Sequence, residues 1–338
     1  MKTSVIILNW NGKKWLEKFL PSVIERTRKA LIVVADNGST DDSKNYMRLH
    51  HPEVVFIEIG KNLGYSGGYN RALRIIKEKY PHLQFSVLLN SDVEPQEGWL
   101  DPLEKRMEKE ASLGAIQPKI LDFHKPNNFE YAGAAGGLLD KWGYPFARGR
   151  VFDDTEEDKG QYDSPEFSKI FWASGACLMI RVSAFFESGL LDERLFAHME
   201  EIDLCWRMNL KGYDIECCTS SSVFHVGGGT LGAISPQKTY LNFRNSLLII
   251  VKNAPTIVAL RIISGRLFFD AAAGALFLFR RQPQHLISVI KAHFSFYKMF
   301  SEFAFSRSNQ KKAWPEHGLY NGSVVWNYFI RKKENINL

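Results

Sequence analysis

Short runs of β-branched and aliphatic residues alternate with segments of helical periodicity over roughly the first 120 residues. Strands separated by helices favour parallel β-α-β units, and such units assemble into an open, doubly wound α/β sheet. Right-handed crossovers place the carboxyl ends of parallel strands, and the loops that follow them, along one edge of the sheet. The runs that we expect to form these strands are residues 5–8, 31–34, 54–59 and 86–89. Before the last of them we expect a loop over residues 61–70 and a helix over 70–79.

Polar residues follow these strands, so one edge of the sheet is predicted to collect them. Ligands of open α/β sheets bind at that edge, which makes these residues candidates for ligand binding. Asp92 follows the last run directly, where burying a carboxylate without a partner is costly. A helix cap, a salt bridge and a metal ion that also holds phosphates are three explanations for it. The residues collected at this edge are Asn9, Asn11, Asp36, Asn37, Gly64, Asn70, Ser91 and Asp92.

The size and charge of the chain limit its function. It has 338 residues and a formal net charge of +6, enough length for one large α/β domain with an appendage, or for two domains. The positive balance favours an anionic partner: a nucleotide, a nucleic acid or an anionic membrane. The 4 cysteines lack CxxC spacing, which indicates reduced core thiols in a cytosolic protein. The first apolar run is too short for a signal peptide, so we expect a cytoplasmic location.

The middle of the chain is less regular. Residues 122–167 show little periodicity, and the run of acids at 153–158 is typical of a solvated loop. Regular structure is predicted to resume at residues 170–180, a strand-like run that is broken at Ser174 and Gly175.

The sequence changes again after about residue 235. Between residues 252 and 312, ten lysines and arginines face only Asp270 and Glu302, in helices rich in Leu, Ile and Phe. The longest uncharged stretch there, 271–279, is far shorter than the ~20 residues of a membrane-spanning helix. Basic, aromatic-rich amphipathic helices favour a segment that lies on an anionic membrane surface, with a packed helical subdomain as the alternative.

Eight segments, taken in order, closely resemble glycosyltransferase family 2. Together they cover roughly residues 3 to 246. The resemblance implies a GT-A fold over residues 1–235, followed by a basic amphipathic helical region over 236–338. It also implies a nucleotide-diphosphate sugar as donor, usually a divalent metal, and inversion at the anomeric carbon. The segments are "VIILNWN" (5–11), "VVADNGSTD" (33–41), "NLGYSGGYN" (62–70), "LLNSD" (88–92), "WASGA" (172–176), "GLLDERLF" (189–196), "EEIDLCWR" (200–207) and "HVGG" (225–228).

The resemblance assigns the nucleoside contact to Asp36, with a helix-capping role as the alternative because cap-type residues follow it. "NLGYSGGYN" matches neither a dinucleotide-binding fingerprint nor a P-loop. Its glycines, Gly64 among them, more simply let the backbone approach the nucleotide or a neighbouring strand. Asn9, Asn11 and Asn70 have an alternative too, because asparagine is common in turns.

Asp92 matches the last position of the DxD motif of the family. Here the triplet is Asn90-Ser91-Asp92, so one carboxylate remains. Mg²⁺ uses one or two carboxylates together with substrate phosphates and water. His225 matches the position of a second metal-binding group, and its imidazole suits Mn²⁺ as well as Mg²⁺. A core or capping role is the alternative for His225.

The segment 200–207 supplies the predicted base. Inversion requires a base that deprotonates the acceptor hydroxyl, and a carboxylate in a closed site does so with a raised pKa. The family usually has Glu-Asp here, and its second acid is the base; that position is Glu201 in this chain. Glu200 and Asp203 are the alternatives. Asp203 also has the i, i+4 spacing for a salt bridge with Arg207, which would make both structural.

The most specific reading is an inverting, metal-dependent transfer of a sugar to a surface polysaccharide or lipid-linked oligosaccharide. The resemblance favours rhamnose from a dTDP donor, with a UDP-sugar as the other donor class. Trp172 and Gly175 are expected to line the sugar pocket, although core packing also explains Trp172. A sugar-phosphate nucleotidyltransferase would need a glycine-rich basic loop, of which "NWNGKKWLEKFL" (9–20) is a poor version. A basic nucleic-acid-binding protein is the other alternative, but the sequence contains no helix-turn-helix, zinc or RNA-platform signature that supports it.

Overall fold

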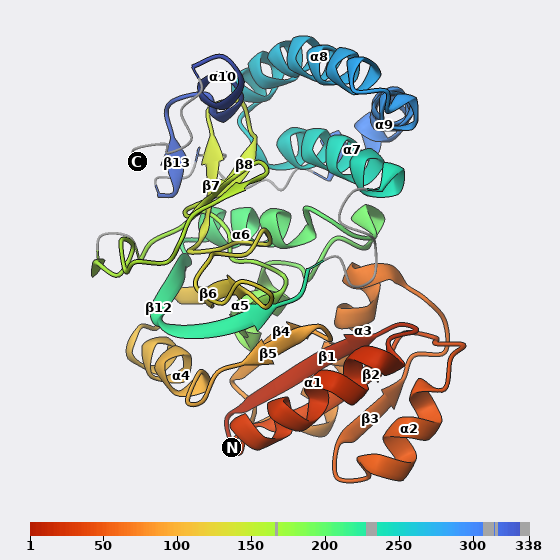
Figure 1. Ribbon diagram of the computed structural model, residues 1–338, viewed down its shortest axis with the longest axis vertical. Helices are drawn as coiled ribbons and strands as arrows, with labels where there is room; N and C mark the ends of the chain where they lie inside the picture. Colours follow the sequence, from red (N-terminus) through yellow and green to blue (C-terminus); the bar gives the residue numbers. More distant parts are fainter. Residues whose placement is uncertain (166–167, 228–234, 307–313, 315–316, 332–338) are drawn as a thin grey trace.

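The computed structural model describes residues 1–165, 168–227, 235–306, 314 and 317–331. The strands of its central sheet are β1 (Thr3–Asn9), β2 (Leu31–Asp36), β3 (Val55–Glu58), β4 (Phe85–Asn90), β5 (Val93–Pro95), β6 (Leu113–Asp122), β11 (Cys177–Arg181) and β12 (Asp214–His225). They lie in the order β3-β2-β1-β4-β11-β6-β12-β5 (Figure 1). The four predicted strands, β1 to β4, pair in parallel with one another, as expected.

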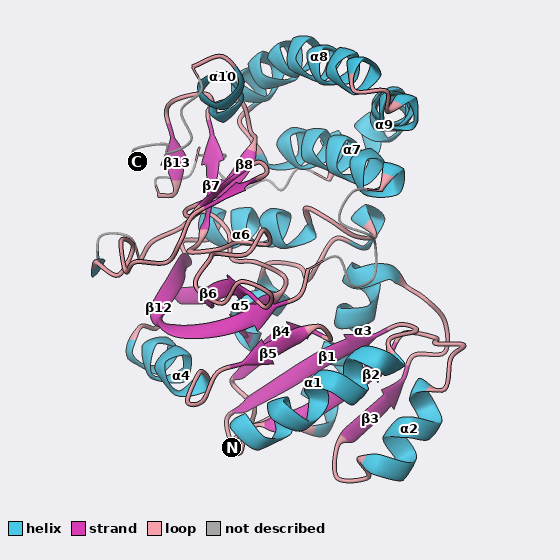
Figure 2. Cartoon of the chain, in the orientation of Figure 1, coloured by secondary structure: helices cyan, strands magenta, loops and turns pink. Residues whose placement is uncertain are grey.

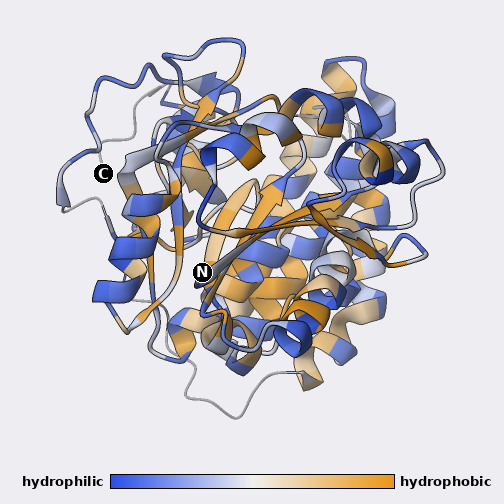
Figure 3. Cartoon of the chain, turned by 90° about the horizontal axis from the view of Figure 1, so that it is seen from below, coloured by the Kyte–Doolittle hydropathy of each residue, from blue (hydrophilic) through white to orange (hydrophobic). Residues whose placement is uncertain are grey.

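Helices cover both faces of this sheet (Figure 2). Val5 and Ile7 of β1 belong to a hydrophobic core shared with the first and fourth helices, whereas Ile6 belongs to a second core on the opposite face. This alternation follows from the two-residue period of a strand. The strands are accordingly hydrophobic, and the helices around them have mixed faces (Figure 3). The helices that flank the sheet are α1 (Lys13–Arg26), α2 (Ser43–His50), α3 (Gly64–Lys79), α4 (Leu100–Lys109), α5 (Val182–Glu187) and α6 (Glu200–Leu210).

Helix α3 begins earlier than the sequence suggested. Residues 61–70 were predicted as a loop, yet the helix starts at Gly64, whose φ of +71° lets the chain turn into it. Gly68 lies in the second turn, where a Cβ would come within 2.7 Å of Leu8 on β1. The glycines therefore allow this helix to approach β1 closely, as one of the predicted roles required.

The segment 122–167 forms most of a second sheet instead of an irregular loop. Its strands are β7 (Gly137–Asp140), β8 (Pro145–Ala147), β9 (Arg150–Val151) and β10 (Asp154–Thr155), and β13 (Leu319–Tyr320) joins them from the end of the chain. The order is β10-β9-β8-β7-β13. These strands have two to four residues each, too few for a period of two to show in the sequence.

The C-terminal region consists mainly of the helices α7 (Pro236–Asn253), α8 (Thr256–Phe279), α9 (Pro283–Phe305) and α10 (Val324–Phe329). Ser235 caps α7, where the predicted boundary lies. This region is tightly joined to the rest. Leu247 and Leu248 of α7 belong to the same core as α6, and Lys252 forms ion pairs with Asp192 and Asp203. The division into two domains at 235/236 stays a prediction.

Within the described residues, α8 is the helix long and apolar enough, by length and composition, to cross a membrane. The uncharged stretch 271–279, whose length predicted that no helix spans a membrane, is only the last part of α8. The helix in fact continues through Arg261, Arg266 and Asp270, and its most apolar window is only 22% buried in the protein.

Candidate active site

The ends of β1 and β2 form a buried polar cluster around Asp36. Asn9 Nδ2 donates to Asp36 Oδ1 at 3.2 Å, and the backbone N–H of Ser39 donates to Asp36 Oδ2 at 3.1 Å. Asp36 therefore closes a turn, and the residue that precedes α2 as its N-cap is Asp42. The helix-capping alternative for Asp36 is wrong, whereas its contact with a nucleoside stays a prediction.

Three predicted asparagines each connect two loops of this edge. Asn11 has a left-handed backbone conformation, with φ of +51°. Asn37 also donates from Nδ2 to the carbonyl oxygen of Gly64 at 3.0 Å. Such bonds hold the loops in place whether or not a nucleotide is bound. Each asparagine also accepts a hydrogen bond at Oδ1 from a backbone N–H group. The donors are Thr40 for Asn11 (2.7 Å), Leu63 for Asn37 (3.0 Å) and Leu191 for Asn70 (3.0 Å).

The candidate metal site lies where β5 pairs with β12. This antiparallel pairing sets His225 opposite Val93, and so beside Asp92 in the preceding turn. His225 Nε2 lies 3.2 Å from Asp92 Oδ1, and both side chains are buried. Ser91, in the same turn, lies close to the start of α1, since a Cβ on Gly12 would be 3.7 Å from its hydroxyl oxygen.

Glu130 completes this cluster and was not predicted. Its Oε2 lies 3.0 Å from His225 Nδ1, which leaves Nε2 facing Asp92. A carboxylate on the far nitrogen is the usual way in which a metal-binding histidine is oriented. Glu130 lies in the segment without periodicity and 95 residues from His225, so no sequence signal pointed to it.

The charges of this cluster suit a cation. Burial alone would lower the pKa of His225, but hydrogen bonds with Asp92 and Glu130 outweigh it and raise the pKa to about 10. A divalent ion beside Asp92 would compete with that proton for Nε2. In the described part of the chain no three His, Cys, Asp or Glu side chains converge as a metal site. Asp92 and His225 therefore fit Mg²⁺ or Mn²⁺ as two of its ligands, with phosphate oxygens and water as the others.

Two neighbouring glutamates begin α6, on the other side of the site. Burial raises the pKa of Glu201 to about 7. Burial and the charge of Glu201 raise the pKa of Glu200 still further. In each, the Oε2 atom is buried and accepts no hydrogen bond from the described residues. A carboxylate in this state is suited to take up a proton near neutral pH.

Asp203, two residues along the helix, is in the opposite state. The predicted i, i+4 ion pair is present, with Arg207 Nη2 at 2.7 Å from Asp203 Oδ2. Lys252 Nζ at 2.9 Å and Asn253 Nδ2 at 2.8 Å also donate to this carboxylate. Burial would raise the pKa of Asp203, but Arg207 and Lys252 lower it below the usual value. These contacts favour the structural alternative for Asp203, and its catalytic role stays a prediction.

A pair of tyrosines from α3 lies between the two groups of acids. The ring centroids of Tyr65 and Tyr69 are 4.6 Å apart. Burial raises the pKa of both, with a further contribution from Glu200 and Glu201 at Tyr65 and from Asp92 at Tyr69. The tyrosines thus lie within electrostatic reach of both halves of the site.

The two residues predicted to line the sugar pocket, Trp172 and Gly175, lie in different surroundings. Tyr65 donates its hydroxyl to the carbonyl oxygen of Gly175 at 2.7 Å, so Gly175 lies in the site. Trp172 is only 6% exposed, and a Cβ on Gly137 would lie 2.1 Å from its ring. The indole N–H donates to the carbonyl oxygen of Leu138 at 3.0 Å. Trp172 is thus a core residue, as the alternative stated, and its contact with a sugar stays a prediction.

The loop before α6 has an unusual backbone. Phe196, His198 and Met199 all have φ between +67° and +72°, a region that costs energy for residues other than glycine. Asn245 of α7 holds this loop, because its Nδ2 lies within 3.0 Å of the carbonyl oxygens of Leu195, Ala197 and His198. Asn245 was not predicted as a site residue, because its contacts are with residues about 50 positions away in the sequence.

Comparison with known proteins identifies the chain. Residues 4–185, more than half of its length, match the profile of Glycosyl transferase family 2. The chain belongs to this family. The GT-A fold predicted from the eight segments is confirmed by the mixed central sheet and by the structural neighbours. As a family 2 glycosyltransferase it acts on nucleotide sugars, which leaves the nucleotidyltransferase and nucleic-acid-binding alternatives without support.

Two relatives are similar to this chain in sequence, and one solved structure is similar to it in fold. An N-acetylglucosaminyl-diphospho-decaprenol L-rhamnosyltransferase of Mycobacterium tuberculosis is 28% identical over 235 residues, which cover 65% of this chain and 75% of the relative. A low-salt glycan biosynthesis hexosyltransferase of Haloferax volcanii is 25% identical over 247 residues, covering 72% and 74%. The structure of GalNAc-T7 with UDP, GalNAc and Mn²⁺ has a TM-score of 0.59 at 19% identity. That alignment covers 89% of this chain and 56% of GalNAc-T7.

The Asn245 contacts predict a specific loss. Asn245→Ala removes the side-chain donor of three carbonyl oxygens in a strained loop, of which only that of Leu195 keeps another donor among the described residues, Arg244, and we expect the change to cost about 1–3 kcal/mol of unfolding free energy. We also expect a lower kcat, because this loop places the start of α6. Urea denaturation and initial rates measure the two effects. Asn242→Ala, on the same helix, is the control and should change stability by less than about 0.5 kcal/mol. Equal losses in both variants would contradict the assignment.

Proposed function

We propose that this family 2 enzyme transfers L-rhamnose, with inversion, from a nucleoside-diphosphate donor to a lipid-linked saccharide. The donor is dTDP-rhamnose in this proposal, with a UDP-sugar as the second choice. Two facts support it: the curated relative from M. tuberculosis has this activity by name, and it aligns with 65% of the chain. The observation that carries the chemistry is the Glu201 carboxylate: its Oε2 atom is buried and accepts no hydrogen bond from the described residues, and burial raises its pKa to about 7.

In the proposed reaction the acceptor hydroxyl attacks the anomeric carbon as the bond to the diphosphate breaks. Glu201 accepts the hydroxyl proton. Burial and the charge of Glu201 raise the pKa of Glu200 well above its usual value, and in this proposal Glu200 is protonated and places no second negative charge beside the base. Asp203 and Arg207 fix the helix that presents Glu201. Inversion follows because attack and departure take place on opposite faces of the sugar.

We propose that Asp92 and His225 hold a divalent cation, Mg²⁺ or Mn²⁺, and that Glu130 orients His225. Such an ion stabilises the negative charge that develops on the departing diphosphate. The Mn²⁺ in the structure of GalNAc-T7, a protein of the same fold, supports this choice. Asp36 contacts the nucleoside in this proposal, and Gly175 lies near the sugar. The remaining nucleotide-site residues are Asn9, Asn11, Asn37, Gly64, Asn70 and Ser91, while Trp172 supports the pocket from the core.

A donor panel tests the proposal. Purified enzyme is incubated with dTDP-rhamnose, UDP-sugars and GDP-mannose, with Mn²⁺ or with a chelator, and release of nucleoside diphosphate is measured. We expect release from dTDP-rhamnose that depends on the metal. Asp92→Ala should abolish this release and leave the thermal unfolding transition in place. Release that is unaffected by the chelator and by Asp92→Ala would exclude the metal role.

The pKa of Glu201 predicts a pH profile. A base must be ionised to work, and burial favours the protonated form, so kcat/KM should rise with pH through about 7 and level off above it. Glu201→Gln should lower kcat by about 10² to 10⁴, the usual contribution of a general base. Activity that survives in Glu201→Gln but is lost in a folded Asp203→Asn variant would move the base to Asp203.

We also propose that the enzyme lies on the cytoplasmic face of the membrane through α8 and α9. Each helix has an apolar face exposed to solvent; Phe268 is 71% exposed on α8 and Phe294 is 73% exposed on α9. The opposite face of α8 is fixed to the protein. There Arg266 forms an ion pair with Asp270 and donates to Ser246 of α7 at 2.9 Å. These contacts favour a helix in the plane of the membrane surface over one that crosses it.

Vesicle binding tests this location. The enzyme should sediment with vesicles that contain anionic lipid, less so as salt is added, and should not bind duplex DNA under the same conditions. Phe268→Asp should weaken vesicle binding several-fold, because it places a negative charge on the docking face. Leu49→Asp is the matched control, since Leu49 is 76% exposed on α2, far from that face in the sequence. Equal binding by both variants would refute the proposed surface.

A further inference from the structure

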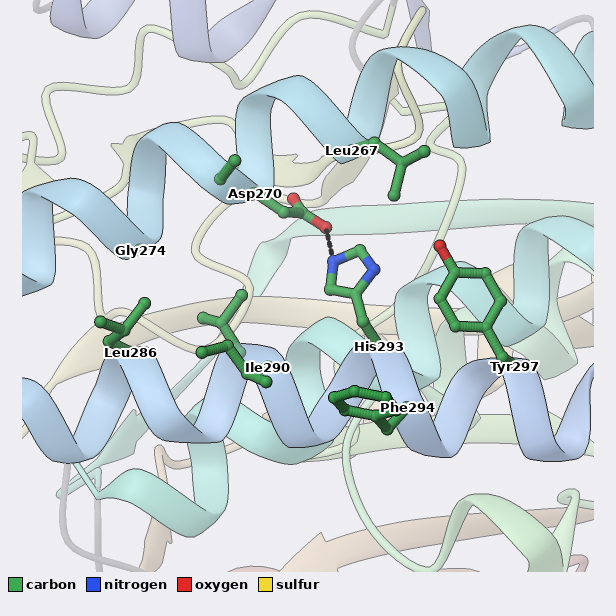
Figure 4. A pocket seen from close by; sticks show the side chains of 10 residues that line it. Leu267, Asp270, Gly274, Leu286, Ile290, His293, Phe294 and Tyr297 are labelled. Atoms are coloured by element: carbon green, nitrogen blue, oxygen red, sulfur yellow. Dashed lines mark hydrogen bonds and ion pairs between the residues drawn. The ribbon is translucent and has the colours of Figure 1, made fainter.

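A pocket of about 400 Å³ lies between α8 and α9 (Figure 4). This volume is in the range of small-molecule sites, about 300–1,000 Å³. Leu267 reaches toward it from α8, and Ile290 and Phe294 from α9. Its surface is nearly all apolar, and it opens between the exposed faces of the two helices.

Asp270, the buried carboxylate beside the pocket, is already paired. The Asp270 carboxylate forms hydrogen bonds with His293 Nε2 at 3.1 Å, with Arg266 Nε at 3.0 Å and with the hydroxyl of Tyr144 at 3.0 Å. A ligand that bound Asp270 would have to displace one of these bonds, at the cost of leaving a buried group unpaired. A hydrocarbon chain would displace none and would gain the burial of its apolar surface. The chemistry of the pocket therefore selects an apolar chain.

We propose that this pocket receives part of the polyisoprenoid chain of the lipid-linked acceptor. The inference rests on the proposed function, because it takes its occupant from the lipid-linked acceptor class. Charge supports this occupant over an uncharged lipid. Five cations on or next to the described parts of the two helices are exposed, and they complement the anionic phosphates that link the chain to its saccharide; they are Arg261, Arg280, Arg281, Lys291 and Lys298.

Acids do not cancel this charge. In the described part of α8 and α9 the acidic residues are Asp270, which is buried and paired, and Glu302, whose carboxylate bonds to Arg194 at 3.2 Å. The exposed surface of the two helices is therefore both apolar and basic, and these are the properties that a lipid phosphate and its chain require.

The pocket is also connected to the catalytic loop. Arg266, which holds Asp270, donates to Ser246 of α7. The neighbouring Asn245 holds the loop before Glu201. One helix thus supports both the chain pocket and the base, while none of the pocket residues is part of the proposed chemistry. Blocking the pocket should accordingly change acceptor binding and leave the chemical step intact.

Two matched pairs of variants test the proposal. Ala271→Phe fills the pocket from α8, and Ala272→Phe places the same ring on an exposed position that does not line it. Ile290→Trp fills the pocket from α9, and Ile287→Trp is its control; the two isoleucines are 47% and 49% exposed. Thermal unfolding checks that all four variants fold. Should one pocket variant fail to fold, the other still decides.

The readout compares two acceptors that carry the same saccharide diphosphate, one on a long polyisoprenoid chain and one on a single isoprene unit. The pocket variants should raise KM for the long-chain acceptor about tenfold, the loss expected when about two methylene contacts are removed. Their kcat, their KM for the short acceptor and their binding to anionic vesicles should match those of the controls. Equal KM values in pocket and control variants, or equal increases for both acceptors, would overturn the proposal. Weaker vesicle binding without chain-length dependence would assign the pocket to bulk lipid and overturn it too.

A binding assay separates this inference from the proposed function. A fluorescent polyisoprenyl diphosphate that carries no saccharide is titrated into the enzyme without donor. Binding that is weakened by Ala271→Phe and not by Ala272→Phe supports the pocket even if the enzyme transfers a sugar other than rhamnose. Absence of such a difference, in an enzyme that does transfer rhamnose, refutes the pocket alone.

Discussion

The antiparallel pairing of β5 with β12 is the constraint on which the site depends. It places His225, which is distant in the sequence, beside the turn that contains Asp92. His225 Nε2 lies 3.2 Å from Asp92 Oδ1. Glu130 holds the other ring nitrogen, so two buried carboxylates share one imidazole. Such a group is tolerable only with positive charge among its members, because isolated buried charges are costly. A protonated imidazole provides that charge, and so would a cation that also binds phosphate.

The C-terminal helices determine the charge state of an acid of α6. Asp203 is neutralised by Lys252 of α7 and by Arg207, whereas no cation in the described part of the chain pairs with Glu201. Burial therefore raises the pKa of Glu201, whereas Arg207 and Lys252 outweigh burial at Asp203 and lower its pKa, so two carboxylates of one helix differ in acidity. The loop before them is held in a strained conformation by Asn245. α7 is thus as much a part of the site as the sheet edge.

The sequence predicted the elements whose signals are local. The strands β1 to β4 and the polar residues after them were found because each strand is a continuous apolar run in a parallel sheet. The start of α3 was placed too late because glycine normally argues against a helix, and only contact with Leu8 explains its presence there. The second sheet was missed because its strands are so short. Glu130 and Asn245 act across 95 and about 50 residues, and no local pattern reports such contacts.

The central claim is that the carboxylate at the end of β4 belongs to a cation site shared with a diphosphate. Anomalous diffraction from crystals grown with Mn²⁺ and a nucleoside diphosphate tests it most directly. If this site holds the cation, we expect one manganese peak in contact with the Asp92 carboxylate, His225 Nε2 and the diphosphate, with the nucleoside beside Asp36. A nucleotide bound at another surface, or bound beside Asp36 with no manganese near Asp92, would contradict it.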